Sequence, residues 1–488
     1  MIRSYQDSSH LRSFEASRER IAAAFPDPAR TADLPVEAAV GRILAAPVRA
    51  GFAVPGTDVA EVDGIAVASR ETRHAAPGSP LAVATSLRVD TGRALPPGTD
   101  AVVPIECCPD GGARLLLEAP IEPGDGVRRA GAELEGGALL LPAGHRLRPV
   151  DVGPLVAAGA ARVRVRAARV GVVPTGGELV PPGTVPGPGE SVASNPLAIR
   201  ALLAPQGAET IVHPVVPDDP AAVLAAIEAL RSEVDLIVVC GGSGRGTRDV
   251  AFGVVRSLGE VVVDGVAARP GRAFLVIRDG AVPVIAMPGR AQPVGLLTEF
   301  FIVPLLAAWG LPVPAAPRAR ARLGLAIESH PGFAEAVPLS IARVGDSVVG
   351  VRQPRGRRGA LSQFRANARL FVPEGVAGYD AGDEVEADLL NDLDGPDRTL
   401  LVVGAVEGLD FRETPYRVVP VPCSEDEARA LLGRSACHLA VLRDALDVPE
   451  GTRALRLADG GEVALAVPPG RADDPKVRAA LATLGVTR

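Results

Sequence analysis

Apolar and polar positions alternate most regularly between residues 169 and 310. Short apolar runs typical of buried strands lie at 169–174, 209–216, 236–239, 261–263, 273–277 and 282–286. Longer stretches with helical spacing of apolar residues lie between or after them, at 195–206, 219–232, 247–258 and 295–309. This alternation predicts an α/β domain built on a parallel sheet, with ligands bound at the carboxyl ends of the strands.

The pattern changes on either side of this region. Residues 8–25 predict a helix with Ser8 or Ser9 as N-cap, and residues 149–159 predict another. Short strands between Pro/Gly turns fill 46–145 and return at 318–392. We therefore expect an α/β multidomain protein. Its parts are a helical linking domain (1–45 plus 146–168), a β-rich domain (46–145), the α/β domain (169–312), a barrel-like β domain (318–392) and an extra α/β tail (398–488).

The run Leu236–Val239 leads directly into a glycine-rich loop that ends at Asp249. Gly241, Gly242 and Gly244 leave backbone N–H groups uncovered beside the start of a helix, which is a setting that binds phosphate or another oxyanion. The Asp249 carboxylate suits a divalent cation that bridges to phosphates. A turn without any ligand remains the alternative.

Charged groups follow other predicted strands as well. Glu178 follows the strand that ends at Pro174, and Asp218 follows the strand near Val216, where it could also be a helix N-cap. Arg269 and Arg272 flank a Pro-Gly turn, and forked guanidiniums suit oxyanions. Together these strand ends predict a site for a phosphorylated ligand, a metal ion and a second anion.

Composition and net charge limit the kinds of partner that are expected. The 488-residue chain has a net charge of −7, so a nucleic acid is not expected as a partner. The basic runs at 162–169 and 352–358 are read as solvated faces, with contact to an anionic ligand as the alternative. Five scattered cysteines, no apolar leader and no run long enough to span a bilayer predict a cytoplasmic protein without membrane attachment.

Ordered motifs carry a family resemblance. The segment Pro55-Gly-Thr-Asp58-Val-Ala-Glu-Val-Asp63-Gly-Ile-Ala-Val67 resembles the Pro-Gly-Phe-Asp-x-Ser-Ala-Met-Asp-Gly-Tyr-Ala-Val signature of the molybdopterin molybdenumtransferases, the MoeA family that includes the gephyrin E domain. Thr91-Gly92, Arg128-Arg129 and Leu361-Ser362 fall in register with later motifs of that family. The resemblance covers residues 8–392.

The resemblance implies an elongated homodimer of four-domain subunits, with the active cleft between the α/β domain of one subunit and the β-rich domain of the other. Such enzymes take adenylylated molybdopterin, molybdate and Mg²⁺, release AMP and insert molybdenum into the dithiolene. They work with other cofactor-biosynthesis proteins or an apo-molybdoenzyme. The implied catalytic residues are Asp58, Glu178, Asp218 and Asp249, of which the last three are metal ligands. The implied binding residues are Thr91, Gly241, Gly242, Gly244, Arg269, Arg272, Pro288 and Ser362.

Departures from the family pattern keep a second function open. Ala60-Glu61-Val62 replaces Ser-Ala-Met, Gly177 replaces an Asp, and Arg290 replaces an Asn. A degenerate member that binds a pterin nucleotide as a carrier or regulator, without efficient turnover, is therefore the alternative. The segment from Gly433 to Val441 resembles periplasmic-binding-protein-like tails, where His438 is either an anion contact or a structural histidine.

Overall fold

The structure is a computed structural model, and it describes residues 11–83, 87–107, 115–241, 250–313, 316–355, 361–390, 395–406, 415–443, 453–456 and 464–483. The chain divides into two compact units, which are described separately. The first contains Met1–Pro26, Arg169–Trp309 and Val313–Arg488, and the second contains Asp27–Ala168 with Gly310–Pro312.

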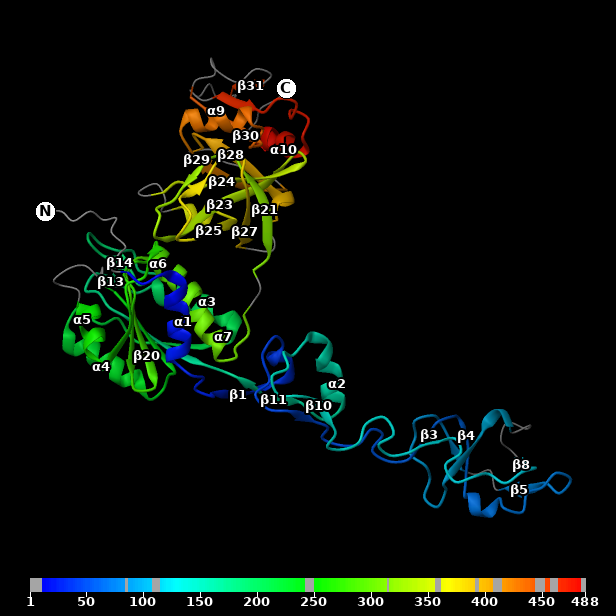
Figure 1. Ribbon diagram of the computed structural model, residues 1–488. Coiled ribbons are helices and arrows are strands. Elements are labelled where there is room, and N and C mark those ends of the chain that lie inside the picture. The colour runs from blue at the N-terminus through cyan, green and yellow to red at the C-terminus, as the bar shows by residue number, and fades with distance from the viewer. Residues whose placement is uncertain are drawn as a thin grey trace. The chain divides into compact units, whose positions relative to one another are not determined.

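A six-stranded sheet forms the centre of the α/β domain in the first unit, in the order β15-β12-β16-β20-β19-β17. The strands are β12 (Arg169–Pro174), β15 (Glu209–Val212), β16 (Leu236–Cys240), β17 (Glu260–Asp264), β19 (Leu275–Asp279) and β20 (Val282–Met287). Every residue of β16 is buried because helices cover both faces of the sheet. Figure 1 shows α4 and α5 on one face and α1, α3 and α7 on the other.

The helices of this domain lie at the predicted segments, but the last begins at Ala291 and not at Gly295, and residues 247–249 of the third lie outside the described residues. The helices are α3 (Asn195–Leu203), α4 (Pro220–Arg231), α5 (Val250–Ser257), α6 (Ala291–Leu297), the π-helical turn η6 (Thr298–Ile302) and α7 (Val303–Ala308). Asp219, and not Asp218, is the N-cap of α4, because its carboxylate accepts the Ala222 N–H at 2.9 Å. The Asp218 side chain is therefore not used as a helix cap.

The sheet is only partly parallel. β15, β12, β16 and β20 run parallel, as predicted, whereas β19 is antiparallel to β20 and β17 is antiparallel to β19. The reason is local, since only a tight turn through Gly280, with φ of 61°, separates β19 from β20. Parallel neighbours need a long crossover connection, so two adjacent strands joined by a tight turn form an antiparallel hairpin.

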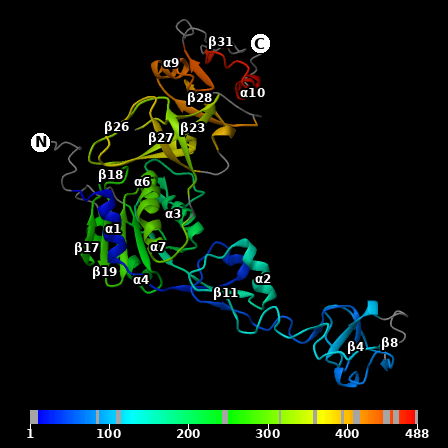
Figure 2. The same ribbon diagram turned by 45° about the vertical axis from the view of Figure 1, so that its right-hand side comes forward.

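Helix α1 (Phe14–Ala24) packs in the first unit, against β17 and α7 (Figure 2). It begins later than predicted, because Ser13 is its N-cap and accepts the Ala16 N–H at 3.2 Å. Ser8 and Ser9 lie outside the described residues. The expected grouping of residues 1–45 with 146–168 differs from this division, in which the first 26 residues belong with the α/β domain.

A closed β-sheet follows in the same unit. Strands β21 (Arg318–Leu323), β23 (Ala334–Val344), β24 (Ser347–Arg352), β25 (Ala368–Val372) and β27 (Glu384–Leu389) pair around a ring that the β23–β25 contact completes. This barrel domain joins the α/β domain through β18 (Ala268–Arg269), which pairs with the start of β23. The short helix α8 (Ser362–Arg365) lies next to the barrel.

The C-terminal tail forms a further small α/β layer. Its sheet has the order β29-β28-β30-β32-β31, from β28 (Thr399–Gly404), β29 (Arg417–Pro422), β30 (Leu439–Leu442), β31 (Arg453–Arg456) and β32 (Ala464–Val467). Helices α9 (Glu425–Gly433) and α10 (Pro475–Thr483) accompany it. Strand–helix alternation in this segment is therefore confirmed.

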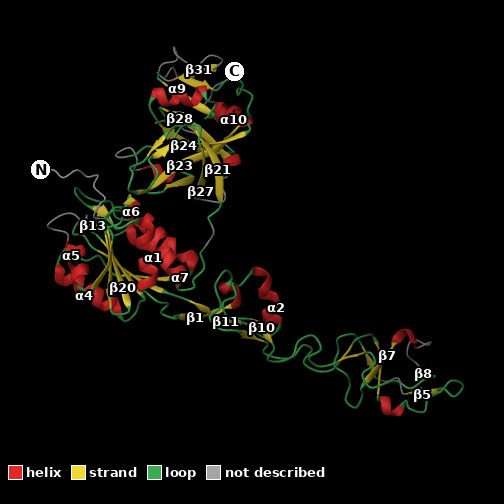
Figure 3. Ribbon diagram, in the orientation of Figure 1, coloured by secondary structure: helices red, strands yellow, loops and turns green. Residues whose placement is uncertain are grey.

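The second unit is built from small sheets (Figure 3). β1 (Thr31–Pro35) pairs with β11 (Arg162–Arg166) beside α2 (Val152–Ala157), and β2 (Val48–Arg49) pairs with β10 (Leu139–Leu141). The β-rich part contains β3 (Val59–Ala60), β4 (Gly64–Val67), β5 (Leu81–Val83), β6 (Arg88–Val89), β7 (Ala101–Pro104), β8 (Leu115–Leu117) and β9 (Val127–Arg128). These strands confirm the β-rich texture expected for 46–145.

Candidate functional site

A cavity of about 580 Å³ opens at the carboxyl ends of β12 and β16 and beside the turn after β20. Thr175, Glu178, Ser194, Asn195, Gly241 and Arg290 are among the residues that line it. These polar groups lie at this edge because each buried apolar strand ends here and the chain continues into a polar loop. The predicted binding edge of the sheet is thus hollowed, as parallel α/β sheets are at their ligand sites.

At Gly241 the backbone passes close to Thr175, beside this cavity. A Cβ at this position would lie 2.4 Å from the Thr175 hydroxyl oxygen, so a larger residue would displace that side chain. The Gly241 N–H itself donates to the Met287 carbonyl at 3.2 Å, so it is not an uncovered anion donor as predicted. Gly242, Gly244 and Asp249 lie outside the described residues.

The two predicted carboxylates at the strand ends flank Thr175. Thr175 is buried and its hydroxyl donates to Asp218 at 3.1 Å, and the exposed Glu178 lies three residues further on. The Glu178 carboxylate turns back over Gly176, where a Cβ would meet its oxygen at 2.7 Å. Among the described residues no group of three or more His, Cys, Asp or Glu side chains lies close enough to hold a metal.

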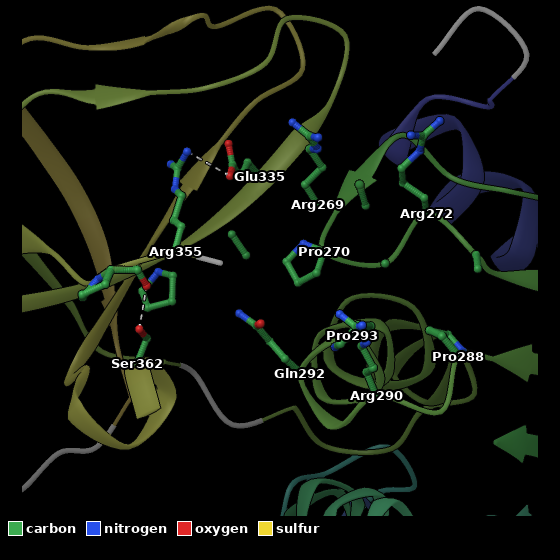
Figure 4. A pocket seen from close by; sticks show the side chains of 16 residues that line it. Arg269, Pro270, Arg272, Pro288, Arg290, Gln292, Pro293, Glu335, Arg355 and Ser362 are labelled. Atoms are coloured by element: carbon green, nitrogen blue, oxygen red, sulfur yellow. Dashed lines mark hydrogen bonds and ion pairs between the residues drawn. The ribbon is translucent and has the colours of Figure 1, made fainter. Parts of the chain in front are cut away.

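A second cavity, of about 590 Å³, lies where the α/β domain meets the barrel domain (Figure 4). Four arginines of the described ranges line it: Arg269, Arg272, Arg290 and Arg355. Glu335 is the one carboxylate among the described residues that line it, so the cavity is strongly positive. We call it the arginine cavity. Such a cluster of forked cations is suited to bind a dianion.

The arginine pair predicted at the Pro-Gly turn is held over an aromatic ring. The guanidinium carbons of Arg269 and Arg272 lie 5.2 Å and 5.0 Å from the centroid of the buried Phe333 ring. This cation–π geometry fixes both groups at one wall of the cavity. Pairing of β18 with β23 sets Arg269 beside Glu335.

The opposite wall comes from the barrel domain. Arg355 forms an ion pair with Glu335 at 3.4 Å, and its guanidinium also donates to the Glu328 carbonyl at 2.8 Å. The predicted Ser362 lines the same cavity, where its hydroxyl donates to the Pro354 carbonyl at 2.7 Å. The structure thus brings Arg269, Arg272, Pro288 and Ser362 together.

One turn lines both cavities. Pro288 and Arg290 border the strand-end cavity and the arginine cavity alike. Asn195, at the start of α3, fastens this turn, because its side-chain amide donates to the Gly289 carbonyl at 2.8 Å. Sequence reasoning missed Asn195 and Glu335. The available signals were an Asn in the first turn of a helix and a lone Glu in a buried strand. Arg355 lay in a basic run that was interpreted as solvated.

The remaining predicted residues belong to the second unit. The Asp58 carboxylate accepts the Ala130 N–H at 2.8 Å and pairs with Arg129 at 3.1 Å. Thr91 donates through its N–H and its hydroxyl to Asp63, at 2.7 Å and 2.9 Å. These hydrogen bonds lower the pKa of the Asp63 carboxyl. Asp58 and Thr91 therefore belong to a different unit from Glu178 and Arg269.

His438 is a structural residue of the tail, and the anion-contact alternative is wrong. Its side chain is 1% exposed, Nδ1 accepts the Leu401 N–H at 3.0 Å, and Nε2 lies 2.9 Å from the Arg343 carbonyl. Since Nδ1 is the acceptor, the ring proton lies on Nε2 and is donated to that carbonyl. Both nitrogens are used by backbone, which leaves neither for an anion.

We expect His438 to make the protein sensitive to acid. Burial lowers the pKa of this imidazole from 6.5 to about 4, so the unfolded chain takes up the proton first as the pH falls. The stabilisation is present above pH 6.5 and is lost towards pH 4, by up to ~3 kcal/mol. Unfolding free energies of the native protein and of His438→Gln, measured between pH 7 and pH 4, should diverge most at pH 7. Equal slopes of the two curves would contradict this.

Comparisons with known proteins identify the family. The family models for the MoeA N-terminal region (domain I and II) and for a probable molybdopterin binding domain match residues 12–159 and 171–308. A molybdopterin molybdenumtransferase from a Nostoc species is 30% identical over 298 residues, covering 56% of this chain and 68% of that protein. This chain belongs to the molybdopterin molybdenumtransferase family.

Further relatives extend the match over the family's whole length. Molybdopterin molybdenumtransferase 2 of Mycobacterium tuberculosis is 29% identical over 396 residues, which is 75% of this chain and 97% of that protein. A MoeA protein from Pyrococcus horikoshii has the same fold, with a TM-score of 0.59, 29% identity and coverage of 78% of this chain and 99% of its own. The multidomain fold predicted from the motifs is confirmed. These relatives leave about a quarter of this chain without a counterpart.

Residues Ala291–Ala308 are the only helical run in the described ranges that is long and apolar enough to cross a bilayer. Half of that run is buried inside the structure, as expected for a core helix of the α/β domain. Its length and composition alone are weak evidence of a membrane span.

Proposed function

We propose that this member of the molybdopterin molybdenumtransferase family inserts molybdate into adenylylated molybdopterin and releases AMP, as a transferase of molybdenum cofactor biosynthesis. The names of its relatives support transferase activity and do not favour a carrier without turnover. The observation that carries the proposal is the adjoining pair of cavities, one at the strand ends and one lined by four arginines.

The two cavities suit the two anions of this reaction. Molybdate is a compact dianion, and the arginine cavity supplies guanidinium donors on opposite walls, from Arg269 and Arg355. The strand-end cavity holds the carboxylate and hydroxyl groups expected near a phosphoanhydride that is cleaved. The Pro288–Arg290 turn, which borders both, would contact the part of the substrate that spans them.

A divalent cation would be held at the strand ends. Glu178 and Asp218 flank Thr175, and Asp249, which lies outside the described residues, directly precedes α5 in the sequence. A few protein carboxylates together with substrate phosphate oxygens are the usual ligands of Mg²⁺, so these residues fit that ion. When bound, it would neutralise charge on the phosphoanhydride. Asp218 would remain oriented by the Thr175 hydroxyl.

The direct test is incubation with adenylylated molybdopterin and molybdate, with AMP release and reconstitution of an apo-molybdoenzyme as the two readouts. We expect AMP to appear only with molybdate and a divalent cation present. Binding of the pterin nucleotide without AMP release would instead establish the carrier or regulator role that the altered signature residues, such as Gly177, left open.

We further propose a homodimer with composite sites, since Asp58 and Thr91 lie in the second unit and the resemblance implies that they serve the partner's cleft. Light scattering should give a dimer, held by an interface well above ~2,000 Å². A mixture of Asp58→Ala and Asp249→Ala subunits should regain part of the activity that each variant lacks. A stable and active monomer would contradict this assembly.

We infer the cellular setting from the same family membership. A cytoplasmic location and delivery of the product to an apo-molybdoenzyme, or to another cofactor-biosynthesis protein, fit this reaction. Fractionation of cells and co-purification with the recipient enzyme would test both.

A further inference from the structure

The C-terminal tail shares one hydrophobic core with the barrel domain. Side chains of β24 and its neighbours, including Val349 and Val351, pack with Leu401, Val403 and Leu431 of the tail, and all of these are buried. Figure 1 shows the tail, in orange and red, against the yellow strands of the barrel. The tail is therefore not a separate appendage, because its removal would expose this core.

Polar contacts from the tail reach the chain segment that carries Arg355. Gln353 is fully buried, and its amide donates to the Ser340 hydroxyl at 2.7 Å and to the Pro420 carbonyl of the tail at 3.0 Å. Its neighbour Arg352 pairs with Glu427 of α9 at 2.6 Å. These two contacts hold the residues immediately before Arg355.

The segment that carries Ser362 is held in the same way. The Arg417 guanidinium of β29 donates to the Phe364 carbonyl in α8 at 3.4 Å. Asn367, just after α8, is fully buried and donates to the Thr399 hydroxyl of β28 at 3.1 Å. The hydrogen bond from Ser362 to the Pro354 carbonyl joins both segments. One wall of the arginine cavity is thus backed by the tail.

We propose that the C-terminal tail is a positioning domain for the arginine cavity, which holds Arg355 and Ser362 in place for the incoming oxyanion. Arg355 is exposed and has a long side chain, so ordering its backbone in advance lowers the entropy lost on binding. Gln353 and Glu427 are positioning residues because they act through Arg355 and do not line the cavity themselves. The choice of molybdate as probe rests on the proposed function.

The test compares two variants that each replace a carboxylate by the corresponding amide, together with a third variant that replaces a buried amide by an apolar side chain. Glu427→Gln weakens a tail–barrel ion pair next to the cavity wall and can keep the capping interaction with Ser424. Asp397→Asn weakens an ion pair between the residue just before the tail and Arg343, near the far end of β23. Gln353→Met is nearly isosteric and removes both amide hydrogen bonds. Each is assayed for molybdate KM, kcat, melting temperature and exchange of the Ala366 amide, which donates to the Ser362 carbonyl at 2.8 Å.

We expect Gln353→Met to raise the molybdate KM at least fivefold and Glu427→Gln about threefold, with kcat within twofold and faster exchange at Ala366. Asp397→Asn should leave all four readouts unchanged. Unchanged KM and exchange in Glu427→Gln, even where Gln353→Met fails to fold, would overturn the proposal. An equal rise of KM in Asp397→Asn would also overturn it. A native protein without turnover would refute the proposed function instead, and amide exchange alone would then decide this inference.

Discussion

Replacing Arg269 by Ala should raise the molybdate concentration needed for half-maximal AMP release by roughly 10- to 100-fold. The guanidinium stands over Phe333 at the wall of the arginine cavity, where it can donate to an oxyanion. A hydrogen bond to a charged group contributes about 1.5–3 kcal/mol, and each 1.4 kcal/mol is a factor of about ten in binding. The kcat at saturating molybdate should change much less.

The control is Arg269→Lys, which keeps the positive charge but cannot form two parallel hydrogen bonds. We expect this variant to lie between the native protein and Arg269→Ala, at a melting temperature close to that of both. Molybdate titrations of AMP release, with a parallel titration of the pterin nucleotide, give the result. Unchanged saturation by both ligands in Arg269→Ala would leave the guanidinium without a role in binding.

Asp218→Asn and Glu178→Gln should each lower kcat for AMP release at least tenfold. Glu178 lines the strand-end cavity, where we place the divalent cation and the phosphoanhydride, and Asp218 does not line it but accepts the hydroxyl of Thr175, which does. Loss of one preorganised charged contact in a water-poor site costs about 2–4 kcal/mol in the transition state. Single-turnover AMP release at saturating substrates measures this effect separately from binding.

Asp219 supplies a matched control one residue away. Its carboxylate caps α4 through the Ala222 N–H, and asparagine caps helices as well as aspartate does. Asp219→Asn therefore removes an adjacent negative charge without removing the cap, and it should keep nearly native kcat. Equal losses in Asp218→Asn and Asp219→Asn would show that overall charge matters, and not the position of the Asp218 carboxylate.

The sequence predicted the elements of the α/β domain well because its strands are short, continuous apolar runs that end in glycine-rich turns. β12 and β16 start and end within one residue of the predicted runs. The reversed direction of β19 was not predicted, because the direction of a strand depends on the connection to its neighbour and not on the apolar pattern of either strand. Likewise, α1 begins at its Ser13 cap and not at the earlier serines.

The candidate site was only partly predictable. Residues after the strands β12 and β20, such as Glu178 and Pro288, could be found because a parallel sheet gathers its carboxyl ends at one edge. Arg269 was found from its Pro-Gly turn, although it lies in β18, outside that sheet. Glu335 and Arg355 enter the arginine cavity only because β18 pairs with β23, a contact between positions more than 60 residues apart in sequence. The local sequence pattern does not reveal such a long-range pairing. The basic run that contains Arg355 therefore could not be distinguished from an ordinary solvated surface.

The turn of Pro288, Gly289 and Arg290 has a consequence for how the two substrates bind. The turn borders both cavities. A ligand in one cavity that binds better to one conformation of this turn therefore changes the affinity of the other cavity for its own ligand. Thermodynamic linkage makes that influence mutual and equal in free energy. If bound nucleotide tightens the binding of molybdate, then molybdate must equally tighten the binding of nucleotide, and an enzyme starved of metal oxyanion would bind its pterin nucleotide more weakly than one well supplied.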